Sequence, residues 1–453
     1  MAPYRIPIIL PVETQVRELD AKLLLACVAA EAGHAVIVGE QDELRANIAS
    51  LPPGLFIAKG FSSSKTRFFK ILKDLGFSVT AWDEEGLVRP EPEMYYIRRV
   101  SPTSLKLLDG VFSWGENYSD LFRSIPFYDG TDVFETGNPR IDLLRSDVRG
   151  YFNDDVAALQ AVHGRYILLN SNFGRVNSAA KRRRDETVGG SATDPVMDAR
   201  WRAMIEYRRS LYHHFRGMLS AVAKALPDYT IVLRPHPAEK IESWHDIEAA
   251  HANVRIIFEG NVVPWLLGAE VLIHNGCTTA IESTLLEKPV IAYQPITSDD
   301  YDWHLPNSLS HHANSNADLI AMLQNHLSGQ RRIEVTPSQR SLLDVHIAHC
   351  SSKLASDLIL DTIHAKFPQL PANRSFTTRQ WAKADAYART MEKRLRSLLP
   401  NDRYASKHQN KRFPELPISE IVARIGRLSR ATGRFKAVRV AMIFPKTFRV
   451  FCD

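Results

Sequence analysis

The sequence predicts an α/β protein made of two Rossmann-like domains that face a central cleft, followed by C-terminal helices. Three observations lead to this fold class. Short apolar runs alternate with helical patterns, which is typical of βαβ units in a parallel sheet. The alternation occurs in two series that meet near residue 155. The chain has 453 residues, which is long for one domain.

The first series contains the candidate strands 5–12, 35–38, 54–58, 77–82 and 109–114. Residues 17–32 carry Leu19, Leu23, Ala26 and Cys27 at helical spacing, and Gly33 follows them. The second series contains the candidate strands 166–169, 229–233, 254–258, 271–274 and 290–293. After about residue 345 the alternation stops, and residues 345–365 and 378–399 predict helices.

This pattern predicts four parts of the chain. An N-terminal Rossmann-like domain is expected over 1–155 and a second Rossmann-like domain over 156–345. Helices over 346–400 should pack back on the body, and 401–453 should form a basic amphipathic tail.

Composition favours a cytoplasmic, globular protein. Hydrophobic residues make up 45% and charged residues 24%, as in ordinary soluble domains. The four cysteines are far apart, which argues against a disulfide framework or a zinc site and favours a reducing compartment. No run of about 18 apolar residues occurs, so no transmembrane helix is expected, and the first residues do not resemble a signal peptide.

Several enzyme classes lack their motifs in this chain. There is no G-x-G-x-x-G after a strand, no G-x-x-x-x-G-K-[ST], no H-E-x-x-H and no G-x-S-x-G. NAD enzymes, P-loop NTPases, zincins and serine hydrolases are therefore disfavoured. The triplet Asp300-Tyr301-Asp302 is a weak metal signal on its own, and neither a metal nor a cofactor is expected.

The stretch Arg234-Pro235-His236-Pro237 directly follows the apolar run 230–233. Two prolines restrict the backbone around His236, so its ring is well placed to donate to a phosphate oxygen. Arg234 adds a permanent cation. The alternative interpretation is a proline-rich strand exit with a surface histidine.

A second stretch, 274–282, follows the apolar run 271–273. Gly276 allows close approach of a ligand, Asn275 precedes it, and Thr278 and Thr279 lie where a helix begins; helix N-termini bind anions. Thr279 and Glu282 also fit a T-x-x-E capping box. Glu282 is therefore either a helix cap or a ligand of ribose hydroxyls.

Together, R-P-H-P and H-N-G-C-T-T-A-I-E resemble motifs of the GT-B glycosyltransferases of bacterial surface polysaccharides, and more closely the surface carbohydrate biosynthesis proteins. The likeness covers roughly residues 5–365 and includes the stretches 11–20, 112–117, 136–142 and 170–174. The motif pair is also similar to that of capsule Kdo transferases, polysialyltransferases and polyol-phosphate polymerases. Gly276 and Cys277 depart from the pattern because they separate Asn275 from the threonine pair.

The resemblance implies a metal-independent enzyme in which His236 and Thr278 or Thr279 hold the donor phosphate. It implies that the domain over 156–345 binds a CMP-activated donor, such as CMP-Kdo or another CMP-linked ulosonic acid. It also implies that the domain over 1–155 binds a glycan or lipid-linked acceptor in capsule or lipopolysaccharide synthesis. Asn172 follows a strand of the second domain and is placed to reach the donor. Two alternatives remain: a CDP-polyol phosphotransferase on the same fold, and a non-catalytic nucleotide-binding partner in a polysaccharide assembly complex.

Glycosyl transfer needs a base or nucleophile besides the phosphate site. Glu13 directly follows the first strand and is the leading candidate; its alternative role is to stabilise the N-terminus of the next helix. Glu84 and Glu85 follow another strand and rank second, and Glu116 ranks third.

The basic tail predicts contact with an anionic membrane. Residues 401–453 contain twelve Lys or Arg and four Asp or Glu, whereas the whole chain has a formal charge of only +6. The charge is therefore no sign of nucleic-acid binding by the main body. Apolar and basic residues alternate at helical spacing, which suggests a helix on the inner face of the cytoplasmic membrane; the alternative is a helix packed on the protein. The apolar set is Ile418, Ile421, Ile425, Leu428 and Phe435, and the basic set is Arg424, Arg427, Arg430 and Arg434.

Overall fold

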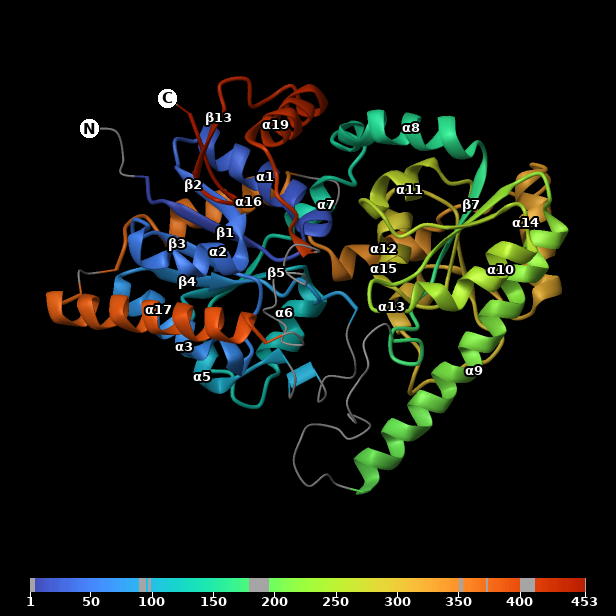
Figure 1. Ribbon diagram of the computed structural model, residues 1–453, viewed down its shortest axis with the longest axis horizontal. Coiled ribbons are helices and arrows are strands. Elements are labelled where there is room, and N and C mark those ends of the chain that lie inside the picture. The colour runs from blue at the N-terminus through green and yellow to red at the C-terminus, as the bar shows by residue number, and fades with distance from the viewer. Residues whose placement is uncertain are drawn as a thin grey trace. The chain divides into compact units, whose positions relative to one another are not determined.

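The chain forms two compact units in the computed structural model (Figure 1). Unit 1 comprises Met1–Tyr151 and Asp344–Asp453, and unit 2 comprises Phe152–Leu343. The structure describes residues 5–88, 95–96, 99–178, 195–349, 353–371, 374–399 and 412–452. Each unit is built on one largely parallel sheet with helices around it, which confirms the predicted pair of Rossmann-like domains.

The sheet of unit 1 has eight strands in the order β13-β14-β2-β1-β3-β4-β5-β6. The strands β1 to β6 run parallel, whereas β13 and β14 form an antiparallel hairpin that pairs with β2. Strand β1 lies between β2 and β3, so the sheet has its topological switch point between β1 and β3. The strands are β1 (Ile8–Val12), β2 (Val36–Glu40), β3 (Leu55–Ala58), β4 (Ser78–Ala81), β5 (Gly110–Ser113), β6 (Val133–Glu135), β13 (Arg439–Phe444) and β14 (Thr447–Phe451).

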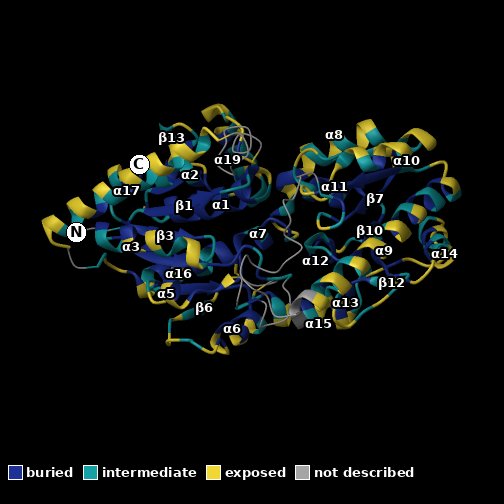
Figure 2. Ribbon diagram, turned by 60° about the horizontal axis from the view of Figure 1, so that its bottom comes forward, coloured by how far each residue is buried: buried dark blue, intermediate teal, exposed yellow. Residues whose placement is uncertain are grey.

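Strands β1 to β5 are buried over their whole length, because helices cover both faces of a parallel sheet. Figure 2 shows these strands in the colour of buried residues, while exposed residues lie on the outer sides of the helices. The helices of unit 1 are α1 (Gln15–Glu31), α2 (Gln41–Ala46), α3 (Thr66–Leu75), α5 (Pro102–Leu105), α6 (Glu116–Arg123), α7 (Pro139–Asp142), α16 (Ala355–Lys366), α17 (Phe376–Ser397), α19 (Ile418–Thr432) and the short 3-10 helices η1 (Ile48–Ser50) and η2 (Ser63–Lys65).

The prediction of one helix over 345–365 is wrong. Helix α15 (Pro337–His346) ends at His346 and α16 begins at Ala355. The start of α16 is fixed from a distant segment, because the Asp142 carboxylate accepts hydrogen bonds from the backbone N–H groups of Ala355 (2.7 Å) and Ser356 (2.9 Å). Burial raises the pKa of Asp142 to about 6.

The C-terminal segment packs on unit 1. Helix α19 contacts α1 and β13, and Ile421, Ile425, Leu428 and Phe435 are buried. Basic side chains of this segment also bind the protein. Arg424 of α19 pairs with Asp20 at 2.5 Å, and Arg434, which follows α19, pairs with Asp357 and Glu31. These apolar side chains are therefore not exposed to a membrane in this structure.

The sequence interpretation missed the hairpin β13–β14. Strand β14 pairs with β2 in the register Thr447↔Gly39, and a Cβ atom at Gly39 would lie 2.8 Å from the carbonyl oxygen of Lys446. Glycine at this position therefore permits the C-terminal hairpin to extend the sheet.

The sheet of unit 2 has six parallel strands in the order β12-β11-β10-β7-β8-β9. Counted within the unit, this is the 3-2-1-4-5-6 order of dinucleotide-binding folds, with the switch point between β7 and β10. The strands are β7 (Tyr166–Asn170), β8 (Thr230–Arg234), β9 (Val254–Ile256), β10 (Leu272–His274), β11 (Val290–Tyr293) and β12 (His311–Ala313).

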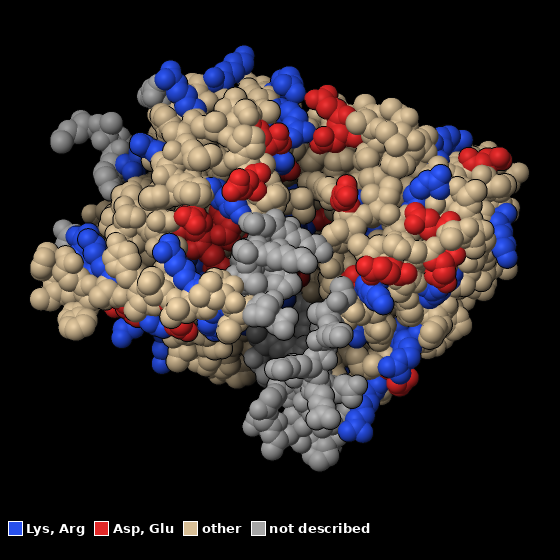
Figure 3. Space-filling model, in the orientation of Figure 1, with Lys and Arg blue, Asp and Glu red and all other residues tan. Residues whose placement is uncertain are grey.

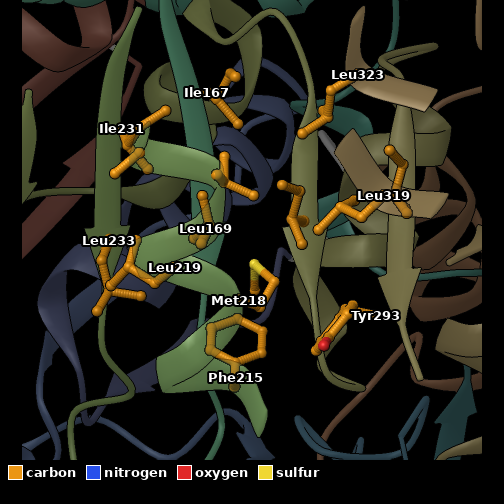
Figure 4. Close-up of a cluster of buried hydrophobic side chains, with 14 of the residues drawn as sticks. Ile167, Leu169, Phe215, Met218, Leu219, Ile231, Leu233, Tyr293, Leu319 and Leu323 are labelled. Atoms are coloured by element: carbon orange, nitrogen blue, oxygen red, sulfur yellow. The ribbon is translucent and has the colours of Figure 1, made fainter. Parts of the chain in front are cut away.

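A single hydrophobic cluster joins this sheet to its long helix α9 (Pro195–Ala225). Figure 4 shows Phe215, Met218 and Leu219 of α9 against side chains of β7 and β8. This packing holds the carboxyl ends of the strands in place. The other helices here are η3 (Arg149–Phe152), α8 (Asn153–His163), η4 (Ile241–Trp244), α10 (His245–Ala250), α11 (Val262–Gly268), α12 (Thr278–Leu285), α13 (His304–Ser308) and α14 (Asn316–Leu327); the unit boundaries fall in η3 and α15.

Candidate functional site

The two sequence motifs lie on either side of one strand of unit 2. Asn170, the last residue of β7, is in register with Arg234 of β8 on one side and His274 of β10 on the other. The R-P-H-P and H-N-G-C-T-T stretches therefore leave the same edge of the sheet, and the β7 exit lies between them. Ligands of open α/β sheets bind in the crevice at such a switch point.

The β7 exit is hydrogen-bonded to the β10 exit across the switch point. The backbone N–H of Asn172 donates to Asn275 Oδ1 at 3.0 Å, and Asn172 Nδ2 donates to the carbonyl oxygen of Gly276 at 2.9 Å. Because a backbone N–H can only donate, this contact identifies the oxygen of the Asn275 amide and leaves Nδ2 as a donor. Asn172 thus holds the second motif in position.

Glu239 links the β7 exit to the first motif, and the sequence interpretation did not assign it a role. Its buried carboxylate accepts five hydrogen bonds: from Ser171 Oγ (2.8 Å), the backbone N–H groups of Phe173 (2.9 Å) and His236 (3.1 Å), Asn177 Nδ2 (3.3 Å) and Trp244 Nε1 (3.3 Å). Burial raises its pKa. The donors come from separate segments, so no local pattern indicates this function.

His236 lies at the surface of this edge with a defined ring orientation. Its Nδ1 accepts a hydrogen bond from the backbone N–H of Ala238 at 3.1 Å. In the neutral ring the proton is therefore on Nε2, which can donate to an anion. The position and tautomer suit the predicted contact with a phosphate.

The Arg234 side chain contacts the loop after β9 instead of serving as a predicted phosphate ligand. Its guanidinium is buried, donates to the carbonyl oxygens of Glu259 (2.7 Å) and Gly260 (3.0 Å), and stacks on Trp265 at 5.0 Å. Burial lowers its pKa to about 10. These contacts fix the loop after β9, so Arg234 has a structural task that accounts for its side chain.

His274 is also a structural residue. It is fully buried, Nε2 bonds to Ser310 Oγ at 2.7 Å, and Nδ1 accepts the N–H of Gly276 at 2.8 Å. Ser310 in turn donates to the carbonyl of Pro306, and burial lowers the pKa of His274 to about 3. The neutral ring thereby shapes the turn that follows β10.

Gly276 is required by backbone conformation and by space. Its φ is +90°, which favours glycine, and a Cβ atom would lie 2.6 Å from Cδ1 of Trp303. The indole of Trp303 thus packs directly on the turn between β10 and α12. Its position next to the glycine was not evident from the sequence.

Helix α12 begins at Thr278 with Cys277 as its N-cap, and no side chain caps it. Of the two alternatives for this stretch, the capping box is therefore wrong, because Thr279 lies inside the first turn and Glu282 lies beyond its third position. Thr278 and Thr279 are partly exposed, and burial raises the pKa of the Cys277 thiol to about 11. Glu282 is 9% exposed on the second turn. The helix presents its first turn at the switch point.

Two asparagines at the switch point keep polar atoms unpaired. Asn170 Oδ1 and Nδ2 and Asn275 Nδ2 are buried and have no hydrogen-bond partner among the described residues; the same is true of Trp303 Nε1. An unsatisfied buried polar group costs about 1–3 kcal/mol, so such a group calls for an explanation. Their concentration next to Gly276 indicates a site that binds a polar ligand.

The carboxylates of the Asp300-Tyr301-Asp302 triplet are engaged by other side chains. Asp302 accepts hydrogen bonds from Tyr207 Oη (2.7 Å) and Gln294 Nε2 (3.2 Å), and Asp300 pairs with Arg200. Among the residues that the structure describes, no group of three or more His, Cys, Asp or Glu is arranged to hold a metal ion. The basic run 181–184 and Gly189-Gly190 lie outside the described residues.

At the switch point of unit 1, Glu13 follows β1 and Lys59 follows β3. Lys59 Nζ lies 2.8 Å from Glu13 and 2.5 Å from Glu18, and Arg412 lies 2.9 Å from Glu13. Burial alone raises the pKa of Glu13, but Lys59 and Arg412 outweigh it and hold the pKa below its ordinary value. Glu13 is therefore an ionised, 39% exposed carboxylate.

Through Lys59, Glu13 is connected to a buried network of charged side chains. Lys22 Nζ lies 2.8 Å from Glu18 and 3.1 Å from Glu84, and it donates to the carbonyl of Pro11 at 2.6 Å. Burial alone lowers the pKa of Lys22, but Glu18 and Glu84 hold it above its ordinary value. Glu84 also accepts from Trp82 Nε1 at 2.9 Å, so its contacts place it within this network.

The remaining two candidate carboxylates are accessible. Glu85 pairs with Arg17 at 2.5 Å and is 40% exposed. Burial raises and Arg17 lowers the pKa of Glu85, with a net shift below the ordinary value. Glu116 is exposed at the start of α6. The structure therefore brings Glu13, Glu84 and Glu85 to one edge of the unit 1 sheet.

No family model and no curated protein matches this chain. Among solved structures, a wall teichoic acid polymerase, TagF, is similar at 13% identity and a TM-score of 0.49, covering 80% of this chain and 88% of that chain. The UDP-GlcNAc 2-epimerase of Neisseria meningitidis bound to UDP-GlcNAc is similar at 12% and 0.48, covering 80% and 100%.

A putative UDP-N-acetylglucosamine 2-epimerase from Listeria monocytogenes is similar at 15% identity and a TM-score of 0.48, covering 82% of this chain and 98% of that chain. At identities below 25% and TM-scores below 0.5, these similarities carry no argument about function. The function must be argued from the residues at the two sheet edges.

Proposed function

We propose that the protein is a glycosyltransferase of bacterial surface polysaccharide synthesis. It moves a sugar from a CMP-activated donor to a glycan or lipid-linked acceptor, and unit 2 binds the donor nucleotide at the β7/β10 switch point. The observation that carries this proposal is the unpaired amide of Asn275 beside the first turn of α12, at a sheet edge where Asn170 is also unpaired.

The phosphate of the donor is placed at the start of α12. The first backbone N–H groups of a helix have no intrahelical acceptor and attract anions. Asn275 Nδ2, Trp303 Nε1 and the protonated Nε2 of His236 are further donors at this edge. They would stabilise the negative charge that grows on the phosphate oxygen as its bond to the sugar breaks.

The choice of cytidine rests on the resemblance of the two motifs to those of CMP- and CDP-dependent transferases. Glu282, mostly buried on α12, is proposed to accept hydrogen bonds from the ribose hydroxyls. Kdo or a related ulosonic acid is the proposed sugar, because CMP is the carrier that this resemblance implies.

Glu13 is proposed as the carboxylate that acts on the reacting groups. Its lowered pKa keeps it ionised at neutral pH, so it can accept the proton of an acceptor hydroxyl or stabilise positive charge on the sugar. The acceptor oxygen forms the new bond to the anomeric carbon, and the electrons of the broken bond remain on the phosphate of CMP.

Calorimetric titration of the full chain with CMP, CDP, UDP and GDP tests the donor. Cytidine nucleotides should bind at least tenfold more tightly than the others, and His236→Ala should weaken CMP binding about tenfold. Absence of cytidine binding would overturn the proposal. If CDP-polyols are turned over and CMP-sugars are not, the protein is the phosphotransferase alternative.

A second experiment separates binding from turnover. Glu13→Gln should leave CMP affinity within twofold and reduce transfer from CMP-Kdo, or from an equivalent CMP-sugar, at least a hundredfold. Glu135→Gln is the matched control, because Glu135 is as exposed as Glu13, at 37% against 39%, and also pairs with an arginine, Arg123. If Glu13→Gln retains full turnover, Glu13 is not the reacting carboxylate.

A further inference from the structure

Helix α17 carries an exposed apolar surface. The helix packs along α3 and against α2 and η1 (Figure 1). Its inner side is tied to unit 1: Ala382 and Ala386 are buried, Arg389 stacks on Phe68 at 4.9 Å, and Lys393 pairs with Asp42. The helix is therefore a fixed part of the fold, and its outer side has a defined direction.

The outer side of α17 and the two leucines after it hold a row of large apolar side chains. Seven of the thirteen large hydrophobic side chains that are exposed among the described residues lie between 376 and 399. At 3.6 residues per turn, the five of them that lie within the helix fall within an arc of roughly 140°. Figure 2 shows exposed residues along the length of this helix. The row consists of Phe376, Trp381, Tyr387, Met391, Leu395, Leu398 and Leu399.

Helix α17 has more basic than acidic side chains. The helix contains six Lys or Arg and two acidic residues, Asp385 and Glu392. Arg67 of α3 binds both acids, at 2.6 and 3.1 Å, so they are neutralised from the body of the unit. In the helical projection, Lys383 and Arg394 border one side of the apolar row, and Asp385 and Glu392 border the other. Figure 3 shows that basic and acidic residues are interspersed on the face it displays.

We propose that α17 docks the protein on an anionic lipid surface, as a second surface independent of the nucleotide site. Aromatic and Leu side chains on one side of a helix with Lys and Arg beside them are typical of helices that lie in the membrane interface, and a long exposed apolar patch marks an interaction site. The helix spans about 33 Å at 1.5 Å per residue, so it lies along the surface with its apolar row inserted.

The charge favours lipid over a second copy of the chain. Pairing two copies through α17 would bring two positively charged helices together, whereas anionic headgroups neutralise Lys and Arg near the surface. Trp381 and Tyr387 also suit the headgroup region, where aromatic residues with a polar end concentrate. No helix among the described residues is long and apolar enough to cross a bilayer.

Co-sedimentation of the full chain with vesicles tests the proposal. The protein should bind phosphatidylcholine vesicles containing 30% phosphatidylglycerol and bind pure phosphatidylcholine vesicles at least fivefold more weakly. The double variant Trp381→Ser, Leu395→Ser should lose at least tenfold. The matched control is Val162→Ser on α8, because Val162 is as exposed as Trp381, at 76% against 78%.

Two charge-reversal variants complete the test. Arg394→Glu should weaken binding to the anionic vesicles about tenfold, whereas Arg332→Glu, on an exposed side chain of unit 2, should not. All seven tryptophans are described; Trp381 is 78% exposed, and the other six are buried or half-buried. Brominated lipids should therefore quench tryptophan fluorescence in the wild type, and Trp381→Phe should remove that quenching.

Three results would overturn the proposal. They are equal binding by the wild type and the double variant, binding that does not depend on anionic lipid, and a dimer in sedimentation velocity that Trp381→Ser, Leu395→Ser dissolves in the absence of vesicles. CMP affinity measured on the same variants should be unchanged, so this test is separate from that of the nucleotide site.

Discussion

The carboxyl edges of the two sheets have the same topological position but differ in how completely their polar groups are paired. In unit 1 the edge holds Lys22, Lys59, Glu13, Glu18 and Glu84, and each of these charges has a partner within 3.1 Å. In unit 2 the equivalent edge holds asparagines and a glycine turn, and several polar atoms lack a partner among the described residues.

This difference suggests that the polar groups of the unit 1 edge stabilise the fold, whereas those of the unit 2 edge are available to a ligand. The unit 1 network satisfies itself, so its side chains are committed to the fold, and only Glu13 and Glu85 extend to the surface. The amides of unit 2 remain available at a cost in stability, as expected of a site that a ligand completes. Substitutions should therefore mainly unfold unit 1, whereas in unit 2 they should mainly alter binding.

The largest expected effect is the loss of Lys22. Lys22→Met leaves Glu18 and Glu84 buried without their shared cation, and breaking a buried ion pair in this way costs about 3–5 kcal/mol. Chemical denaturation followed by tryptophan fluorescence measures the free energy of unfolding. Arg165→Ala, which breaks the exposed pair with Glu270, should cost less than about 1 kcal/mol; similar losses for both variants would contradict the account.

The next effect depends on pH. Lys22 and Lys59 hold the pKa of the buried Glu18 far below its ordinary value of 4.5, although burial alone raises it. A depressed carboxylate pKa stabilises the fold above the unfolded pKa, and this contribution is lost as pH falls toward the folded pKa. Glu18→Gln should therefore destabilise by about 3 kcal/mol at pH 7 and by clearly less at pH 3. A difference that is constant over this range would show that Glu18 is not the stabilising charge.

A smaller effect is expected at the unit 2 turn. Gly276→Ala places a methyl group against Trp303 at a φ of +90°, which should cost about 1–3 kcal/mol and weaken CMP binding. Gly329→Ala is the matched control, because Gly329 has φ +77° and no atom within 4 Å of its Cβ position. The excess cost at Gly276 measures the contact with Trp303, and equal costs would show that the indole moves away.

The smallest change in stability should accompany a large change in binding. Asn170→Leu removes two buried polar atoms that have no described partner; the stability should stay within about 1 kcal/mol or increase, while CMP binding should fall. Thr80→Val in unit 1 also removes an unpaired buried oxygen and should leave CMP binding unchanged. If Asn170→Leu unfolds unit 2, its amide has a structural partner.

Local patterns were sufficient for most of the fold. Apolar runs identified β7, β8, β10 and β11 nearly to the residue, because strands buried on both faces read as continuous hydrophobic segments. The hairpin β13–β14 was missed because β13 is half-exposed and therefore does not have the pattern of a buried strand. Its place in the sheet depends on Gly39, some 400 residues away along the chain.

The site was less predictable because its roles depend on contacts between segments. Arg234 follows a strand and matches the motif, yet its guanidinium binds the 259–260 loop. Glu239 has no local signal, yet it joins the β7 exit to the β8 exit. Residue type and strand position placed both motifs at strand ends, and the structure has them at one edge of the sheet. The contacts that occupy Arg234 and Glu239 depend on distant segments and appear only in the hydrogen bonds.

The most direct measurement of the central claim is hydrogen–deuterium exchange of the full chain with and without saturating CMP. The account predicts slower exchange at residues 170–173 and 274–279 of unit 2, where the β7 and β10 exits meet α12, and little change at residues 11–18 of unit 1. Protection confined to unit 1, or no protection in either unit, would contradict it.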